Sequence, residues 1–217
     1  LARDLLKNPK KVEVTPPSTT VDKIKQQVIM CQKGSKYTLL QKFIKENDIE
    51  LGLIFSRTKH GANRISDFLQ KIEIPSAAIH GNKSQNNREL ALANFKSGKI
   101  KFLVATDIAA RGIDVEGISH VINFDVPVDA ESYVHRIGRT ARAGREGEAY
   151  TFCDDTEKDS LKRIEKLIKK ILPKTDYVED PQEKKIRNRE ASKALAGKKK
   201  TLDPKKPKIG YRFRNRK

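Results

Sequence analysis

The segment HRIGRTARAGREG, residues 135–147, combines one histidine with four arginines and is kept slim by glycine and alanine. If a helix begins near Ala130, the side chains of His135, Arg139 and Arg142 stand at positions i, i+4 and i+7 and share one face. Arginine stays charged at any useful pH, and its planar fork of N–H donors matches phosphate oxygens. The segment therefore predicts either a phosphate-binding device or a solvated basic surface. The basic surface is the commoner use of such a cluster taken alone.

A second group of polar residues follows the apolar run KFLVA. Thr106 and Asp107 come directly after that run, and Asp114 closes the loop ARGID, in which Gly112 lets a ligand approach the backbone closely. A carboxylate in a loop at a strand end can accept hydrogen bonds from sugar hydroxyls, as in other nucleotide-binding folds. In isolation, an aspartate that only caps the following turn explains Asp114 equally simply.

These side chains need a scaffold, and the hydrophobic periodicity describes one. Short apolar runs predict strands, and apolar residues three and four apart predict helices between them. The predicted strands are 51–56, 76–80, 101–107, 120–125 and 147–153. The predicted apolar helix faces are Ile65, Phe68, Leu69 and Ile72; Leu92 and Phe95; and Leu161, Ile164, Ile168 and Ile171. This alternation predicts an α/β fold with a mostly parallel sheet covered on both faces.

The carboxyl ends of the predicted strands are the places to look for a ligand site, because open parallel sheets bind ligands there. Those positions hold the residues SRT at 56–58, HG at 80–81, TD at 106–107 and the loop IAARGID. We therefore expect polar and glycine residues to collect at one edge of the sheet.

The charge of the chain favours an acidic partner. The net charge is +18 over 217 residues, and nucleic acid is the first candidate. Most of this charge lies in the segment 181–217, which has 15 Lys and Arg against 3 Asp and Glu. Cys31 and Cys153 match no metal-ligand spacing, and we expect reduced thiols and a cytoplasmic protein. No apolar run is long enough to span a membrane, and no signal peptide is evident.

The two ends of the chain differ from its body. Residues 1–6 predict a helical piece, and residues 8–20 predict an extended, proline-bearing linker. After Pro173 the apolar pattern stops, so we expect the part from 175 to 217 to be a mostly disordered basic tail, with a possible short helix around 182–195. The folded domain is expected at 23–174. Since the sequence starts at Leu1 in mid-pattern, we expect a fragment of something longer.

Four stretches together resemble the motifs of one family. They are LIFSRTK at 53–59 (motif IV), HGNKSQNNR at 80–88 (the glutamine-x-x-arginine element), VATDIAARGIDV at 104–115 (motif V) and YVHRIGRTARAGREG at 133–147 (motif VI). In order and approximate spacing, from about residue 24 to about 172, the chain resembles the C-terminal RecA-like domain of a DEAD-box RNA helicase. HGNKSQ and the lysine-rich tail resemble the bacterial RhlE-like branch. The resemblance implies a RecA-like sheet of the P-loop NTPase type, and it makes residues 1–22 the end of the first helicase domain and the interdomain linker.

The resemblance also implies roles for individual residues. Arg139 and Arg142 would be catalytic arginine fingers on the γ-phosphate of ATP, and Gly112 and Asp114 would contact the ATP ribose. His135 and Arg136 would couple nucleotide state to domain closure by meeting groups of the opposite domain. The RNA backbone would be touched or framed by Arg57, Gly81, Gln85 and Thr106, with Arg88 and Asp107 ordering those loops. Ala141 replaces a glycine common in the family, and because alanine favours helix we expect a tolerated variation.

The sequence lacks two elements that an ATPase of this kind needs. There is no G-x-x-x-x-G-K-[ST] phosphate loop and no Asp-Glu-Ala-Asp box to hold Mg²⁺ and position water. We therefore expect no metal site in this chain. ATP and Mg²⁺ would be held mainly by an N-terminal RecA-like domain that the chain lacks, and this chain alone would be inactive.

Three functional hypotheses follow. The leading one is the second domain of an ATP-dependent RNA helicase that unwinds short RNA duplexes, with RNA and the first domain as partners and ribosomal or RNA-decay complexes as further candidates. The second is a stand-alone RNA-binding module that uses the basic tail, in which Tyr211 and Phe213 stand among arginines. The third is a DNA-directed motor of the same superfamily.

Overall fold

The computed structural model describes residues 24–111, 113–142 and 145–185. Its strands are β1 (Ile24–Met30), β2 (Gly52–Phe55), β3 (Ser76–Ile79), β4 (Phe102–Ala105), β5 (His120–Asn123), β6 (Gly147–Cys153) and β7 (Lys174–Asp176). Its α-helices are α3 (Lys36–Glu46), α4 (Lys59–Lys71), α5 (Gln85–Lys96), α6 (Asp107–Ala110), α7 (Ala130–Ile137) and α8 (Lys158–Ile168). Two single 3₁₀ turns, η1 (Lys33–Ser35) and η2 (Asp155–Glu157), precede α3 and α8.

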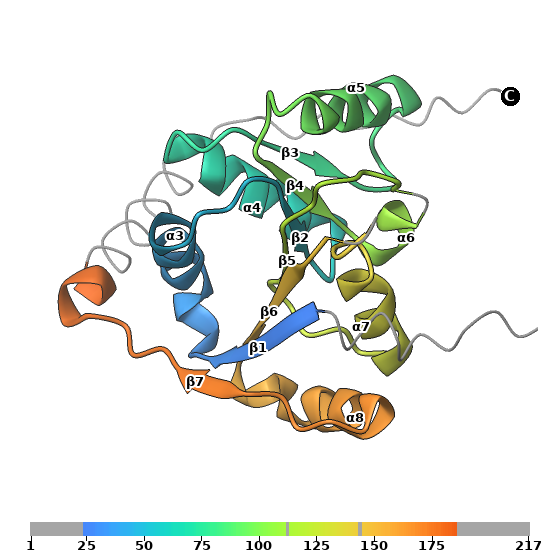
Figure 1. Ribbon diagram of the computed structural model, residues 1–217. Coiled ribbons are helices and arrows are strands. Elements are labelled where there is room, and N and C mark those ends of the chain that lie inside the picture. Colours follow the sequence, from blue (N-terminus) through green and yellow to red (C-terminus); the bar gives the residue numbers. More distant parts are fainter. Residues whose placement is uncertain (1–23, 112, 143–144, 186–217) are drawn as a thin grey trace, which may run out of the picture. The chain divides into compact units, whose positions relative to one another are not determined.

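The strands form one sheet in the order β3-β4-β2-β5-β6-β1-β7 (Figure 1). Every pairing in this sheet is parallel. Parallel neighbours need crossover connections, and helices supply most of them. The predicted α/β fold with a mostly parallel sheet is confirmed.

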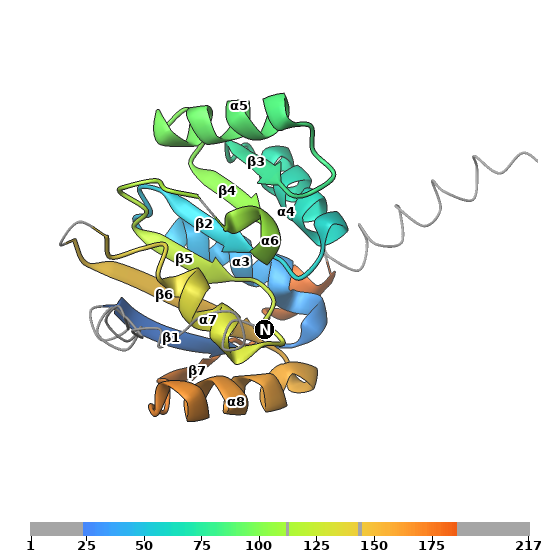
Figure 2. The same ribbon diagram turned by 90° about the vertical axis from the view of Figure 1, so that its right-hand side faces the viewer.

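Each face of the sheet has its own apolar core, because successive side chains of a strand point to opposite faces. In β2, Leu53 and Phe55 pack with α5, α6, α7 and α8, whereas Ile54 packs with α3 and α4. Figure 2 shows these two groups of helices on opposite sides of the sheet. The four residues of β2 are all buried, as expected for a strand covered on both faces.

The structure extends the predicted element list and corrects one face. All five predicted strands are present, but β1 and β7 were not among them. The predicted apolar face of the last helix included Ile171, which is 81% exposed. Helix α8 ends at Ile168 because Lys169 adopts a left-handed conformation with φ of 52°. The chain turns there, so Ile171 no longer follows the buried face of α8.

The folded unit continues slightly beyond the predicted boundary at 174. Strand β7 pairs with β1, and the N–H of Tyr177 donates to the carbonyl of Met30 at 2.8 Å. A separate unit begins at Glu179, and within it residues 181–185 are helical. The predicted helical piece 1–6, the linker 8–20 and the tail beyond 185 lie outside the described residues. No helix in the described part of the chain is long and apolar enough to cross a membrane.

The two cysteines are neighbours in the sheet although they are distant in sequence. The N–H of Cys31, just after β1, donates to the carbonyl of Cys153 at the end of β6, at 3.0 Å. Both thiols are free, as predicted. Burial raises the pKa of Cys31 to about 11 and that of Cys153 to about 12.

Candidate functional site

The predicted site loops gather at the carboxyl edge of the sheet. Strands β3, β4 and β2 are consecutive neighbours, and all of them run parallel. The residues after them, His80–Gly81, Thr106–Asp107 and Ser56–Arg57, therefore emerge side by side. The expectation that polar and glycine residues collect at one edge is confirmed.

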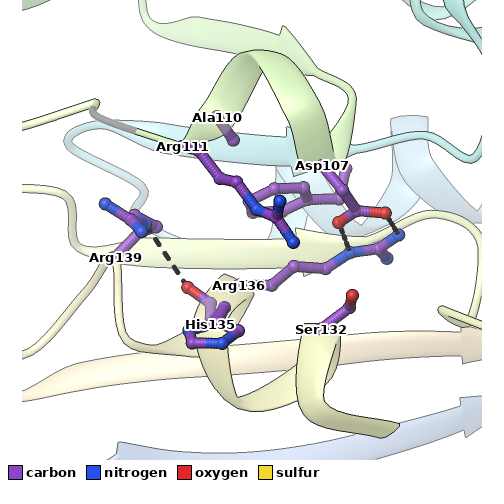
Figure 3. A pocket seen from close by; sticks show the side chains of 8 residues that line it. Asp107, Ala110, Arg111, Ser132, His135, Arg136 and Arg139 are labelled. Carbon is purple, nitrogen blue, oxygen red and sulfur yellow. Dashed lines mark hydrogen bonds and ion pairs between the residues drawn. The ribbon is translucent and has the colours of Figure 1, made fainter. Parts of the chain in front are cut away.

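Arg136 is anchored inside this domain. Its side chain, on α7, is 2% exposed and forms a bidentate ion pair with Asp107, from Nε to Oδ1 at 2.5 Å and from Nη2 to Oδ2 at 2.8 Å (Figure 3). Nη1 donates to Asn123 Oδ1 at 3.2 Å and to the carbonyl of Asp125 at 2.8 Å. The guanidinium carbon also lies 5.0 Å from the centre of the Phe55 ring. Arg136 thus ties α7 to the turns after β4 and β5.

These contacts use most of the hydrogen-bond donors of Arg136. A guanidinium offers five N–H groups, and within this domain four of them are already donated. Within this domain the side chain therefore joins motifs V and VI, and its predicted contact with an opposite domain stays a prediction. His135, the next residue on α7, is exposed, and its interdomain contact stays a prediction.

A small, open hollow lies between α6 and α7. Its lining residues include Asp107, Arg111, Ser132, His135, Arg136 and Arg139. Figure 3 shows the side chain of Arg111 reaching from the end of α6 over the hollow. Arg111 lies within the motif V stretch, and no role was predicted for it. Its basic side chain, one residue before Gly112 in a strand-end loop, was the available signal.

Arg139 and Arg142 lie beyond the helix on which they were predicted. Helix α7 ends at Ile137, so these two residues do not share a helical face with His135. The Nε of Arg139 donates to the carbonyl of His135 at 3.3 Å, and its Nη1 donates to that of Ile113 at 3.1 Å. The Nε of Arg142 donates to the carbonyl of Gly138 at 3.1 Å. The sequence showed the helical spacing but not where the helix stops.

Arg142 also forms an ion pair with Asp114. Its Nη1 lies 2.6 Å from Asp114 Oδ1, and the side chains of Arg142 and Asp114 are 30% and 86% exposed. The predicted finger and the predicted ribose contact are thus in direct contact in this state. Such an exposed pair is weakly held and is screened by salt. Gly112, predicted beside Asp114, lies outside the described residues.

The surroundings of Arg139 favour an anion. Partial burial, and then the neighbouring charge of Arg142, lower the pKa of Arg139, whereas Asp114 opposes this shift. The two arginines therefore repel each other across a partly desolvated surface. A phosphate group placed between them would relieve that repulsion.

Ala141 adopts a left-handed backbone conformation, with φ of 55°. The helix has already ended at Ile137, so the helix preference of alanine gives no reason for Ala141 to be tolerated here. A non-glycine residue in this conformation costs about 1–2 kcal/mol. The neighbouring backbone is tightly packed: a Cβ atom at Gly147 would lie 2.7 Å from the nitrogen of Ala141. Whether the alanine is tolerated stays a prediction.

The loop after β3 begins at the buried His80 and continues through the exposed Gly81 and Asn82. The N–H of Asn82 donates to His80 Nδ1 at 3.3 Å, so the proton of the neutral ring is on Nε2, which lies 3.0 Å from Asn63 Oδ1. Burial, and then the charge of Lys83, lower the pKa of His80. A Cβ at Gly81 would meet nothing within 4 Å, so space is open above this residue.

The remaining predicted RNA residues lie at the start of α5 and after β2. Gln85 is exposed on the first turn of α5, and Arg88 Nη1 approaches Gln85 Oε1 at 3.5 Å. Arg57 is exposed, and its N–H donates to Asp125 Oδ2 at 2.8 Å. Thr106 is half-buried at the start of α6. The geometry is compatible with these predicted RNA contacts, which stay predictions. No group of three His, Cys, Asp or Glu side chains in the described residues could hold a metal ion.

Residues 35–144 match the family described as the helicase conserved C-terminal domain. The chain belongs to this family. Together with the relatives below, the match identifies it as a C-terminal RecA-like domain of DEAD-box RNA helicases. The helicase C-terminal domain thus contains motifs IV and V and most of motif VI within the matched range.

Curated relatives of this helicase domain are RNA helicases. The chain is 43% identical over 174 residues to the ATP-dependent rRNA helicase RRP3 of Eremothecium gossypii, covering 80% of this chain and 36% of that protein. It is 42% identical over 172 residues to the DEAD-box ATP-dependent RNA helicase CshA of Bacillus licheniformis, covering 79% and 35%. The chain spans about a third of the length of these relatives. Their names favour the leading hypothesis over both alternatives, and assignment to the RhlE-like branch stays a prediction.

Solved structures agree with this helicase domain. S. cerevisiae Dbp5 bound to RNA and ADP BeF3 superposes with a TM-score of 0.74 at 29% identity, covering 87% of this chain and 50% of that one. E. coli SrmB bound to the regulator of ribonuclease activity A gives 0.66 at 33% identity, covering 72% and 92%.

Proposed function

We propose that this domain is the second domain of an ATP-dependent RNA helicase, which supplies arginine fingers, a ribose contact and RNA-backbone contacts for local duplex unwinding. The observation that carries this proposal is the state of Arg139 and Arg142. Both guanidinium groups lie on the segment after α7, and among the described residues they are held by main-chain carbonyls and one exposed carboxylate. Such contacts are easily exchanged for stronger, charge-assisted contacts to phosphate.

The residues present fit part of an ATP site. Two guanidinium groups fit phosphate oxygens, and the exposed carboxylate of Asp114 can accept hydrogen bonds from ribose hydroxyls. When bound, ATP supplies the phosphoanhydride bond whose hydrolysis drives the cycle. Mg²⁺ and the phosphate chain would be held mainly by a domain with a phosphate loop, since this sequence has none.

Within this domain, Arg142 and a bound ribose would share one acceptor. Ribose hydroxyls that donate to Asp114 would compete with Arg142 for this exposed carboxylate, which has acceptor sites for both. A guanidinium held by such an exposed pair can move toward phosphate. Arg136 does not move with it, because its pair with Asp107 holds α7 against the RNA-side turn.

The predicted RNA-binding residues of the domain contact the sugar-phosphate backbone of RNA. Arg57, Gly81, Gln85 and Thr106 emerge at one edge and are exposed or half-buried. Contacts of this kind to phosphate and sugar carry little base information, so binding is independent of sequence. The name of the rRNA helicase RRP3 supports ribosomal RNA as a substrate class, and the free thiols support a cytoplasmic location.

The test compares this chain with the full-length enzyme that carries it. The purified chain alone should show no RNA-stimulated ATP hydrolysis, and the full-length enzyme should show it. Single-stranded DNA should stimulate far less than RNA. Hydrolysis by this chain alone, or equal stimulation by DNA, would overturn the proposal.

A further inference from the structure

The carboxyl edge of the sheet continues beyond the motif strands, and it carries a buried carboxylate there. Glu157, at the end of η2 after β6, is 4% exposed. Its Oε1 accepts hydrogen bonds from Arg57 Nη2 at 2.6 Å and from the N–H of Val126 at 3.2 Å. A buried carboxylate is costly unless it is paired and hydrogen-bonded. Glu157 lies outside all four motif segments, yet it holds the side chain of a motif IV residue.

The other oxygen of Glu157 is held by a buried lysine. Lys36 Nζ, at the start of α3, lies 2.5 Å from Glu157 Oε2, 3.0 Å from the carbonyl of Phe124 and 3.6 Å from Asp154 Oδ2. The side chains of Lys36, Asp154 and Glu157 are all at most 5% exposed. With Arg57, these residues form two cations and two anions, so the group is electrically neutral. Lys36 therefore fixes the Glu157 carboxylate through the oxygen that does not contact Arg57.

Arg57 is held along one side only. Its main-chain N–H donates to Asp125 Oδ2 at 2.8 Å, and its Nη2 donates to Glu157 and, at 3.3 Å, to the carbonyl of Val126. The side chain is 47% exposed. Within the described residues, none of its hydrogen bonds uses Nε or Nη1. One edge of the guanidinium is therefore anchored while the rest stays available to an anion.

We propose that Glu157 is a positioning residue for RNA binding: it fixes the guanidinium of Arg57 so that its remaining N–H groups meet an RNA phosphate. This inference rests on the proposed function, because it requires RNA at this edge of the sheet. A long arginine side chain loses rotamer freedom when it binds, and one that is already ordered loses less. Lys36 supports Glu157 in this role.

The sign of the effect separates positioning from simple electrostatics. Removing a carboxylate near a polyanion should tighten RNA binding if charge alone matters. Removing a positioning carboxylate should weaken it. We expect Glu157→Gln to weaken binding about threefold to tenfold, the range for immobilising one flexible side chain.

The test uses the full-length enzyme and a short single-stranded RNA, with fluorescence anisotropy in the presence of a non-hydrolysable ATP analogue. Because Glu157→Gln removes the nearer of the two carboxylates beside the buried Lys36, the double variant Lys36→Met/Glu157→Gln is measured beside it and keeps the net charge of Lys36, Arg57, Asp154 and Glu157 at zero. Asp155→Asn is the matched control, since it removes an exposed carboxylate from the same turn. Thermal unfolding checks that each variant is folded.

Four results would support the proposal together. The double variant weakens RNA binding about threefold to tenfold, Asp155→Asn does not, and the double variant has no further effect in an Arg57→Ala background. In steady-state ATPase assays, the RNA concentration for half-maximal stimulation rises by the same factor while kcat at saturating RNA stays within about twofold.

Other results would overturn it. An equal loss with and without Arg57 would show that Glu157 only stabilises the fold, and unchanged or tighter binding would show that it does not position Arg57. If Arg57→Ala leaves RNA affinity unchanged while RNA still stimulates ATP hydrolysis, the inference fails and the helicase function stands. If RNA neither binds nor stimulates, the proposed function fails as well.

Discussion

Helix α7 and the short segment after it treat their arginines in opposite ways. On α7, Arg136 is 2% exposed, pairs with Asp107 through two bonds and stacks on an aromatic ring. In residues 138–142, Arg139 and Arg142 reach back to main-chain carbonyls and to one exposed carboxylate. Arg136 anchors α7, whereas Arg139 and Arg142 can change partners, although all three belong to one sequence motif.

The contrast teaches that desolvation, more than residue type, decides what an arginine does. A buried ion pair is costly to break because the remaining charge has no water around it. An exposed pair is worth little, since water replaces the lost partner. The following predictions use this difference.

The largest effect is expected on ATPase activity, from substitution of Arg139 or Arg142. In the full-length enzyme, Arg139→Ala and Arg142→Ala should each lower kcat for ATP hydrolysis about a thousandfold or more, because arginine fingers contribute roughly 10³–10⁵ in rate. Urea unfolding of the isolated chain should change by less than about 1 kcal/mol. Arg163→Ala, on the exposed face of α8, is the control and should leave both quantities unchanged. A large loss of stability in Arg139→Ala or Arg142→Ala would show that these arginines anchor the fold as Arg136 does.

The anchor should show the reverse pattern. Arg136→Ala frees Asp107, whose side chain is 36% exposed, and removes a donor from the buried Asn123, so the free energy of unfolding should fall by about 1–3 kcal/mol. Arg136→Lys should recover only part of this loss, because an ammonium group cannot form the bidentate pair. Chemical denaturation of the chain measures both variants. A loss below about 1 kcal/mol would place Arg136 with the exposed arginines.

Relieving the backbone strain at Ala141, in the segment after α7, should stabilise the domain. Ala141 has φ of 55°, a conformation that glycine adopts without cost. Ala141→Gly should therefore raise the free energy of unfolding by about 0.5–1 kcal/mol, after the greater freedom of glycine in the unfolded chain is subtracted. Ala143→Gly, in the same motif, is a comparison site. Destabilisation by Ala141→Gly would show that the methyl group packs favourably.

The smallest effect concerns the start of α7. Asp129 caps the helix by accepting from the N–H and the hydroxyl of Ser132, both at 2.9 Å. The hydroxyl of Ser132, and then its N–H, lower the pKa of Asp129, so the unfolded chain holds the proton more tightly. This contribution to stability is present above the ordinary pKa of 3.8 and is lost as pH falls through the folded pKa.

Asp129→Asn tests this contribution, since asparagine keeps the cap but does not titrate. The midpoint temperature of unfolding should fall less steeply for the variant than for the parent chain below about pH 4. Identical slopes for the two proteins would contradict the assignment.

The alternation of apolar runs predicted five strands, the parallel sheet and the edge where the motifs meet. It did not predict that α7 stops at Ile137, because the charged residues keep a helical spacing of i, i+4 and i+7 beyond the end of the helix. Nor could it separate Arg136 from Arg139, since burial depends on Asp107 and Asn123, which come from distant turns. Glu157 was missed for the same reason: its partners arrive from three other parts of the chain.

The low reactivity of its two native thiols makes this domain convenient for site-specific labelling. Maleimides react with the thiolate, and an exposed cysteine has a pKa of about 8.5. With pKa values of about 11 and about 12, Cys31 and Cys153 carry far less thiolate at neutral pH. A cysteine introduced at the exposed Glu131, on the first turn of α7, should therefore accept a dye selectively in the unmodified background. Single-molecule fluorescence could then follow α7 through the ATP cycle without replacing either native cysteine.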